Sequence, residues 1–228
     1  MTGGPSGRHD PAVAESPFRL DRQTAWVIGS DSRTRDTVVA ALRAAGAWIA
    51  RSPTAAAAGS GIAPILAAIG HAEALDIFVN LMAFDRGSAV GDVSEDELDA
   101  AIEDVVEASF LLSQAAASRM RSVKSTASLA SILHVATPLA RVGAANRSVC
   151  CMAMHALKGL TMASAIELGP MGIRVNMIEA AVGEHRERAL PHAVTADNIA
   201  ASIVYLCSPA AAATTGSSLL LDAGWTAR

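Results

Sequence analysis

The segment CCMAMHALKGLT, residues 150–161, lies in a long apolar region that we expect to be helical from 148 to 168. A Gly-Pro pair follows this region and is typical of a helix end. Residues four apart share one face of a helix, so Cys150 and Met154 are neighbours there. A thiol beside a thioether offers little acid–base chemistry. This pair of residues therefore does not by itself indicate a function for this face of the helix.

Short β-rich runs alternate with helical patterns along the rest of the chain. This alternation predicts an α/β fold, namely a Rossmann-like, doubly wound parallel sheet flanked by helices. The expected strands are 24–28, 47–50, 76–79, 129–135, 173–178 and 217–221. The expected helices are one that ends at Gly46, followed by 62–69, a long one within 92–121, 148–168 and 197–206.

Length and composition limit the function classes. The 228 residues suit a flexible N-terminal arm at 1–23 and a single domain at 24–228. A net charge of −4 offers no basic face for nucleic acid. The most apolar run, 54–70, is interrupted by Gly, Ser and Pro, so no membrane span is expected. Three cysteines, two of them adjacent, form no disulfide framework, which favours a cytoplasmic protein, and no metal site is expected.

The segment at 150–161 resembles the active-site helix of the short-chain dehydrogenase/reductase family, whose pattern is Tyr-x-x-x-Lys followed by Gly-Leu-Thr. Segments 110–115, 172–176 and 221–224 resemble the same family, in the same order along the chain. The resemblance covers nearly all of the chain after Thr24 and implies the family's Rossmann-like fold. Because a fold does not carry function by itself, the site residues need separate inspection.

The connection between the second and third expected strands is short. Only one helix, 62–69, fits between Arg51 and Leu75, which is the length of a single crossover. The family has a helix, a strand and a second helix at this place. The resemblance therefore implies that one strand–helix unit is missing from the adenine-binding half.

The resemblance also identifies the positions of the family's catalytic Asn, Ser, Tyr and Lys. In this chain they are Val105, Thr137, Cys150 and Met154, and of these residues only Thr137 has a hydroxyl group. A cation at 154 would be needed to stabilise a thiolate at 150, and Met154 has none. None of the four can pass a proton to an alkoxide near neutral pH, so we expect no catalytic residues at these positions.

The cofactor loop of the family, Thr-Gly-x-x-x-Gly-x-Gly, corresponds to residues 28–35. Gly29 keeps the first glycine, Ser30 follows it, and Arg33 and Arg35 replace the other two. Glycines are needed there because the backbone approaches the diphosphate closely. Asn80 keeps the first residue of the family's Asn-Asn-Ala-Gly turn, but Leu81 and Met82 follow it. We therefore expect these degenerate positions to bind no cofactor.

Two other interpretations of Arg33 and Arg35 remain open. Guanidinium groups at a helix N-terminus could recruit a phosphate. Alternatively, the two side chains face solvent or pair with Asp31 and Asp36, which are close in sequence.

The sequence favours a pseudoenzyme, a structural or regulatory subunit that does not bind NAD(P). The family assembles through its two long helices, here 97–121 and 148–168, so we expect a homo-oligomer or a hetero-oligomer with an active family member. One alternative is a cofactor-independent cyclase, dehydratase or isomerase that reuses the cavity, with His134 or a Cys151–His155 pair as candidates. A second alternative is an atypical NAD(P)-dependent oxidoreductase.

Overall fold

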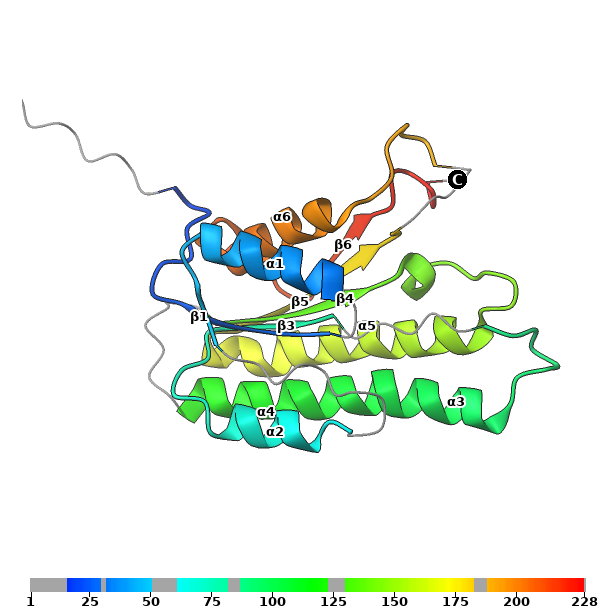
Figure 1. The fold of residues 1–228 in the computed structure, drawn as a ribbon, viewed down its shortest axis with the longest axis horizontal. Helices are drawn as coiled ribbons and strands as arrows, with labels where there is room; N and C mark the ends of the chain where they lie inside the picture. Colours follow the sequence, from blue (N-terminus) through cyan, green and yellow to red (C-terminus); the bar gives the residue numbers. More distant parts are fainter. Residues whose placement is uncertain are drawn as a thin grey trace, which may run out of the picture.

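The protein was analysed as a computed structural model, which describes residues 16–29, 32–50, 61–81, 87–122, 130–182 and 188–227. These residues contain a six-stranded parallel sheet with the strand order β2-β1-β3-β4-β5-β6 (Figure 1). The strands are β1 (Thr24–Ile28), β2 (Trp48–Ile49), β3 (Ile77–Asn80), β4 (Ala130–Ala136), β5 (Ile173–Ala180) and β6 (Ser218–Leu221). The predicted doubly wound α/β fold is confirmed.

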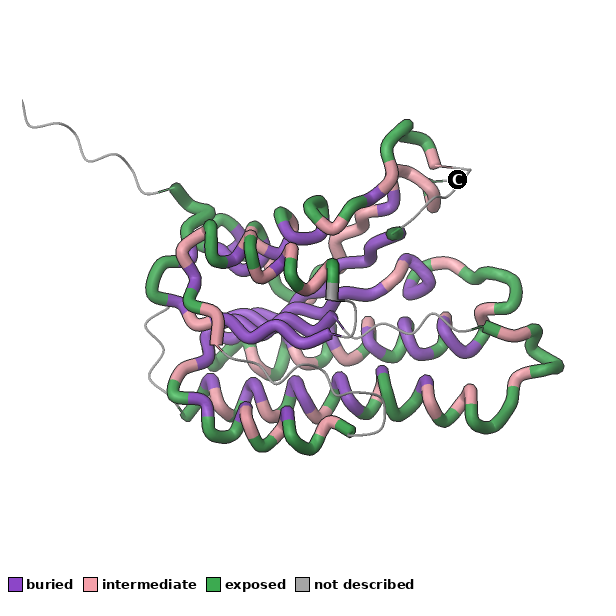
Figure 2. The backbone as a smooth tube through the Cα atoms, viewed as in Figure 1, coloured by how far each residue is buried: buried purple, intermediate pink, exposed green. Residues whose placement is uncertain are grey.

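Helices cover both faces of the sheet. The helices α1 (Ser32–Ala44) and α6 (Ala196–Cys207) lie on one face, and α2 (Ala63–Gly70), α4 (Ala108–Ser122) and α5 (Ser148–Leu168) lie on the other (Figure 1). Every residue of β3, β4 and β5 is buried, as expected for parallel strands covered on both sides (Figure 2).

Local sequence signals explain where several helices begin. The hydroxyl of Ser94 accepts a hydrogen bond from the N–H of Glu97 at the start of α3 (Glu95–Ala101). Thr195 and Asn198 form a full capping box at the start of α6. Between α3 and α4 the helix takes six residues of π-helical form, η1 (Ile102–Glu107), and η1 contains the position of the family's catalytic Asn.

The connection between β2 and β3 contains one described helix, α2. Residues 51–60 of this connection lie outside the described residues. Within the described sheet, β2 has only two residues and forms the edge next to β1. The described part of the adenine-binding half is therefore smaller than the resemblance would lead one to expect.

The end of the expected N-terminal arm lies against the domain. Residues 1–15 are outside the described residues, but Leu20 is completely buried in the core. The ring of Phe18 lies 6.4 Å from the ring of Tyr205 in α6. The segment from Ser16 to Gln23 thus packs on the α1–α6 side of the sheet.

One described stretch, Ser148–Met171, is long and apolar enough to span a membrane by length and composition alone. Its α5 portion packs one side against the sheet and buries Val149, Ala153 and Leu157, among others. A helix in the core of a protein can have the same length and apolar composition, and α5 is placed as such a helix.

Candidate functional site

A cavity of about 590 Å³ lies at the carboxyl ends of the central strands. We call it the carboxyl-edge cavity. It is mostly apolar, and its walls come from the start of α1, the ends of β3, β4 and β5, the loop before α5 and the C-terminal turn. The residues that line it include Thr34, Leu81, Thr137, Arg147, Ala180 and Trp225. Ligands of doubly wound folds bind at this edge of the sheet, at the point where the strand order reverses.

Three of the four positions that correspond to the family's catalytic residues lie in the core. Val105, Cys150 and Met154 are each completely buried and belong to one apolar cluster that also includes Met177. Cys150 and Met154 do lie on one face of α5, as the spacing predicts, but that face packs against the protein. At these three positions, therefore, this chain has no side chain that could transfer a proton to or from a substrate in the cavity.

Thr137 is the exception, because it lines the cavity. It follows β4 and begins the short 3₁₀ turn η2 (Pro138–Ala140). Its hydroxyl oxygen accepts a hydrogen bond from the N–H of Leu139, 3.3 Å away. The hydroxyl hydrogen remains able to donate to another group, such as a carbonyl oxygen in the cavity.

Two arginines of the expected cofactor loop, Arg33 and Arg35, lie in the first turn of α1. Arg33 is exposed, and Nη1 of Arg35 donates to the carbonyl oxygen of Gly29, 3.3 Å away. Nη2 of Arg35 lies 3.5 Å from the carboxylate of Asp36. Neither Arg33 nor Arg35 is among the residues that line the carboxyl-edge cavity.

Gly29 is required for packing rather than for freedom of its backbone. A Cβ atom at this position would lie 2.5 Å from Cβ of Leu81, the residue that follows β3. Leu81 lines the cavity and is almost fully buried. Ser30 and Met82, which the sequence also places at this site, lie outside the described residues.

Asn80 and His134 form a buried polar chain between β3, β4 and α4. Nδ2 of Asn80 lies 3.0 Å from Oγ of Ser109 and 3.3 Å from Nδ1 of His134, and Nε2 of His134 lies 3.4 Å from Oγ of Ser113. Complete burial lowers the pKa of His134 to about 4, so its ring is neutral at neutral pH. None of these residues is among those that line the carboxyl-edge cavity, and the chain serves the structure of the sheet.

The suggested Cys151–His155 pair does not form a thiolate–imidazolium contact. Nδ1 of His155 lies 2.8 Å from the backbone carbonyl oxygen of Cys151, and the thiol of Cys151 donates to the carbonyl oxygen of Val142. His155 is exposed. Among the described residues, no group of three or more His, Cys, Asp or Glu side chains is arranged to hold a metal ion.

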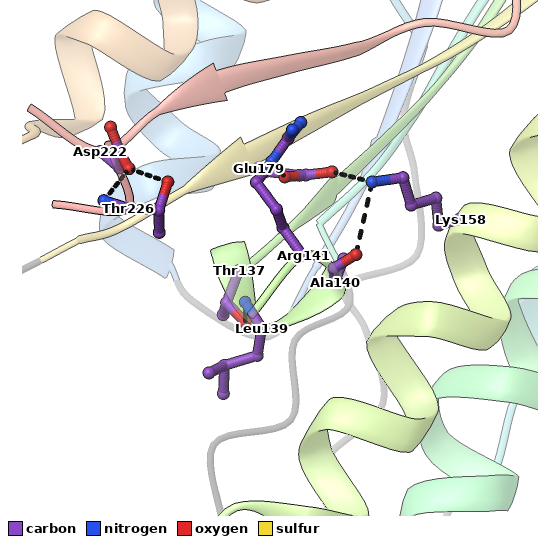
Figure 3. A network of polar contacts seen from close by, with 8 residues as sticks. All are labelled: Thr137, Leu139, Ala140, Arg141, Lys158, Glu179, Asp222 and Thr226. Atoms are coloured by element: carbon purple, nitrogen blue, oxygen red, sulfur yellow. Dashed lines mark hydrogen bonds and ion pairs between the residues drawn. The ribbon is translucent and has the colours of Figure 1, made fainter. Parts of the chain in front are cut away.

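A buried carboxylate lies beside the cavity. Glu179, at the end of β5, is completely buried and accepts from Nε of Arg141 at 2.9 Å and from Nζ of Lys158 at 3.1 Å. Lys158 also donates to the carbonyl oxygen of Ala140, 3.4 Å away, so the three charges connect β5, η2 and α5 (Figure 3). The cluster fixes the turn that carries Thr137.

The C-terminal turn forms another wall of the cavity. Asp222 accepts hydrogen bonds from the backbone N–H and the hydroxyl of Thr226 (Figure 3). It also accepts from the N–H of Gly224. Burial acts to raise the pKa of Asp222, but these hydrogen bonds outweigh it and hold the pKa below its usual value. The turn places Trp225 at the cavity, and the carbonyl oxygen of Ala223 accepts from the N–H groups of residues 189 and 190.

Sequence reasoning missed Arg147, Glu179 and Trp225. Arg147 and Trp225 belong to no motif, and only folding brings the C-terminal turn beside the loop before α5. Glu179 did leave a signal, since it is, with Arg174, one of two charged residues in a strand that is mostly apolar. Such a residue needs cationic partners when it is buried.

Comparisons with known proteins agree with this geometry. A family model described as enoyl-(acyl carrier protein) reductase matches residues 22–188. The trans-4-hydroxycyclohexanecarboxylate dehydrogenase of Sinomonas cyclohexanicum is 32% identical over 72% of this chain and 66% of its own length. The D-threitol dehydrogenase of Mycolicibacterium smegmatis is 28% identical over 67% of this chain and 63% of its own length. The chain thus spans slightly less than two thirds of these curated relatives.

A solved structure of a protein from Agrobacterium tumefaciens has a similar fold. The protein is proposed to be a 2-deoxy-D-gluconate 3-dehydrogenase, and its structure contains bound NADP. It is 25% identical to this chain, with a TM-score of 0.80, and the match covers 94% of this chain and 100% of the other.

The comparisons contradict two expectations from the sequence. The relatives are named as dehydrogenases and the structural relative contains NADP, so the prediction of a pseudoenzyme and the prediction of no cofactor are wrong. The comparisons support the second alternative, an NAD(P)-dependent oxidoreductase. The physical reason lies in the open cavity, because the replaced glycines do not close it.

Proposed function

Because the chain belongs to the short-chain dehydrogenase/reductase family, we propose that it is an NAD(P)-dependent oxidoreductase whose reaction takes place in the carboxyl-edge cavity. The observation that carries this proposal is the position of the cavity. It lies between the start of α1 and the ends of β3, β4 and β5, where β1 leads to β2 on one side and β3 lies on the other. This is the switch point at which doubly wound sheets bind nucleotides.

The described residues fit the nicotinamide half of such a cofactor. Leu81 and Ala180 provide an apolar wall, and Thr34 contributes a hydroxyl at the start of α1. The first turn of α1 has no acidic residue, so its N–H groups and the nearby Arg33 favour a diphosphate there. When bound, the cofactor supplies or accepts the hydride of the reaction.

Thr137 is the residue that we propose to orient the substrate. Its hydroxyl is held by the N–H of Leu139 and lines the cavity, so it can donate to a carbonyl oxygen. The Arg141–Glu179–Lys158 cluster steadies the turn that begins at Thr137. Such support by neighbouring charges keeps a binding group in one geometry.

The proton must come from a donor other than the family's tyrosine. Cys150 and Met154 are buried in the apolar cluster and cannot exchange a proton with a substrate in the cavity. Water in the cavity is the donor that we propose. A positioned general acid contributes roughly 10² to 10⁴ in rate, so we expect turnover to be slower by about that factor than in family members with a tyrosine.

Cofactor binding tests the proposal. NADPH and NADH are titrated by calorimetry against the wild type, the variant Thr34→Tyr and the control Ala40→Tyr, which places the same ring on the exposed side of α1. We expect micromolar binding by the wild type and control and at least a tenfold loss in Thr34→Tyr. No binding by the wild type at millimolar cofactor would refute the proposal. Binding without oxidation of NADPH by a panel of aldehydes and ketones would support the cofactor site and contradict the redox reaction.

We also propose that the enzyme self-associates through α4 and α5. The outer faces of these helices expose Phe110, Met162 and Ile166, and Ile166 is 78% exposed. A groove of about 700 Å³ between α2, α4 and α5 adds further apolar surface. Exposed apolar side chains beside such a groove support an interface at this place.

Sedimentation of the purified protein tests this assembly. The wild type is expected to sediment as a dimer or tetramer, and Ile166→Glu as a smaller species, while Val90→Glu, at an exposed site in the loop before α3, serves as a control. A monomeric wild type would contradict self-association. A heteromeric complex in cell extracts that is lost in Ile166→Glu would show that this surface binds a different protein.

We place the enzyme in the cytoplasm. All three cysteines are thiols in the structure, and Cys150 and Cys207 are buried. Proteins with reduced cysteines are typical of reducing compartments. Fractionation of the native host with an antibody to the chain tests this location.

A further inference from the structure

One charged side chain belongs to the wall of the carboxyl-edge cavity. Among the described lining residues, only Arg147 carries a charge, and the rest are apolar apart from Thr34 and Thr137. Arg147 directly precedes α5 and is half-buried. A cation in an apolar wall loses hydration, so its interaction with an anion is stronger there than in bulk water.

Gly87 packs closely against the segment that carries Arg147. A Cβ atom at Gly87 would lie 2.1 Å from the carbonyl oxygen of Asn146 and 2.8 Å from Cδ of Arg147, so only glycine permits this approach of the two segments. Arg147 already has an interaction within the protein. A guanidinium has five N–H donors in a planar fork, so it can bind a carboxylate in addition.

We propose that the cavity selects a substrate with a carboxylate group, namely a small hydroxy acid or oxo acid with an apolar body. Arg147 binds the carboxylate, and Thr137 binds the hydroxyl or carbonyl oxygen. The apolar body contacts Ala144, Ala145 and Trp225. A volume of about 590 Å³ is in the range of small-molecule sites. Turnover of this substrate rests on the proposed function, whereas binding of its carboxylate by Arg147 does not.

The reaction on such a substrate is balanced. In the oxidation of a secondary alcohol, the carbinol carbon gives its hydride to oxidised NAD(P) and the hydroxyl gives its proton to water. The products are the oxo acid, NAD(P)H and one proton. The carboxylate of the substrate takes no part in these bonds, so Arg147 acts in binding and orientation alone.

A pair of matched probes tests the inference. Cyclohexanecarboxylate and cyclohexanecarboxamide have nearly the same shape and differ in charge. Their binding to the full chain is measured by calorimetry, without cofactor and with NADPH. We expect the wild type to bind the acid about tenfold to a hundredfold more tightly than the amide, as is typical for a hydrogen bond to a charged group.

Substitutions at Arg147 locate the preference. Arg147→Gln is expected to bind the two probes equally, Arg147→Lys to retain part of the preference, and Arg43→Gln, at an exposed site in α1, to behave as the wild type. Equal binding of both probes by the wild type would overturn the inference, whatever the variants do. A preference that survives in folded Arg147→Gln would also overturn it.

The separate cofactor titration distinguishes this inference from the proposed function. Acid-selective binding without any NADPH binding would retain the carboxylate site and reject the oxidoreductase. NADPH binding with no preference for the acid would retain the proposed cofactor site and reject the carboxylate site.

Discussion

The ammonium group of Lys158 lies 3.1 Å from a carboxylate oxygen of Glu179, and Glu179 is completely buried at the end of β5. The guanidinium of Arg141 contacts the other oxygen at 2.9 Å. A carboxylate without access to water depends on such partners. The two cations are themselves partly exposed, with side chains 39% and 28% accessible for Arg141 and Lys158.

We therefore expect Glu179→Gln to lower the free energy of unfolding by roughly 2–4 kcal/mol, since it leaves two cations side by side without their anion. Urea denaturation monitored by circular dichroism measures this loss. Glu167→Gln, at an exposed site in α5, is the matched control and should change stability by less than about 0.5 kcal/mol. Equal stability of the two variants would show that the cluster does not hold η2 in place.

His134 predicts a dependence of stability on pH. Burial lowers its pKa from 6.5 to about 4 in the folded state, whereas the unfolded chain keeps the ordinary value. The contribution of the neutral ring is complete above pH 6.5 and is lost as the pH falls toward the folded pKa. The free energy of unfolding should fall by at most about 3 kcal/mol over this interval because of His134.

Urea titrations at several pH values check this contribution. His134→Asn should flatten the slope of stability against pH between 4 and 6.5, apart from the effect of the carboxyl groups. His71→Asn, at an exposed site, should keep the slope of the wild type. If both variants retain that slope, His134 is not the group that titrates.

The fold was predictable because its signals are local and repeated. Periodicity and caps at Ser94 and Thr195 place the helices within a few residues of where the structure has them. The π-helical segment Ile102–Glu107 was not predicted, because the apolar pattern continues through it without a change. Such a segment is set by packing rather than by sequence period.

The candidate site was only partly predictable. The four positions that correspond to the family's catalytic residues came from the resemblance, and of these Thr137 lines the cavity. The directions of the Arg33 and Arg35 side chains are a property of the folded loop, which the replacement of two glycines does not reveal. Arg147 and Trp225 lie far apart in sequence, so their common cavity becomes visible only in three dimensions.

Gly224 predicts a link between the C-terminal turn and the segment at 189–190. Its φ of +81° favours glycine, and a Cβ atom there would lie 2.7 Å from Cβ of Ala189. We expect Gly224→Ala to lower the free energy of unfolding by about 1–2 kcal/mol and to shift the fluorescence of Trp225, which lines the cavity. Gly91→Ala is the control, since no atom lies within 4 Å of its added Cβ. Unchanged fluorescence in Gly224→Ala would show that the turn does not set the position of Trp225.

The buried cluster around Met154 predicts that the family's lysine cannot simply be put back. Met154 is completely buried among apolar side chains, including Val105 and Met177, so an ammonium there would lose its hydration without a partner. We expect Met154→Lys to lower the free energy of unfolding by about 3–5 kcal/mol in urea denaturation. Met152→Lys, two residues earlier on the same helix and 46% exposed, should change it by less than about 0.5 kcal/mol. A Met154→Lys variant as stable as the wild type, with faster turnover of NADPH, would mean that this face of α5 still opens onto the cavity.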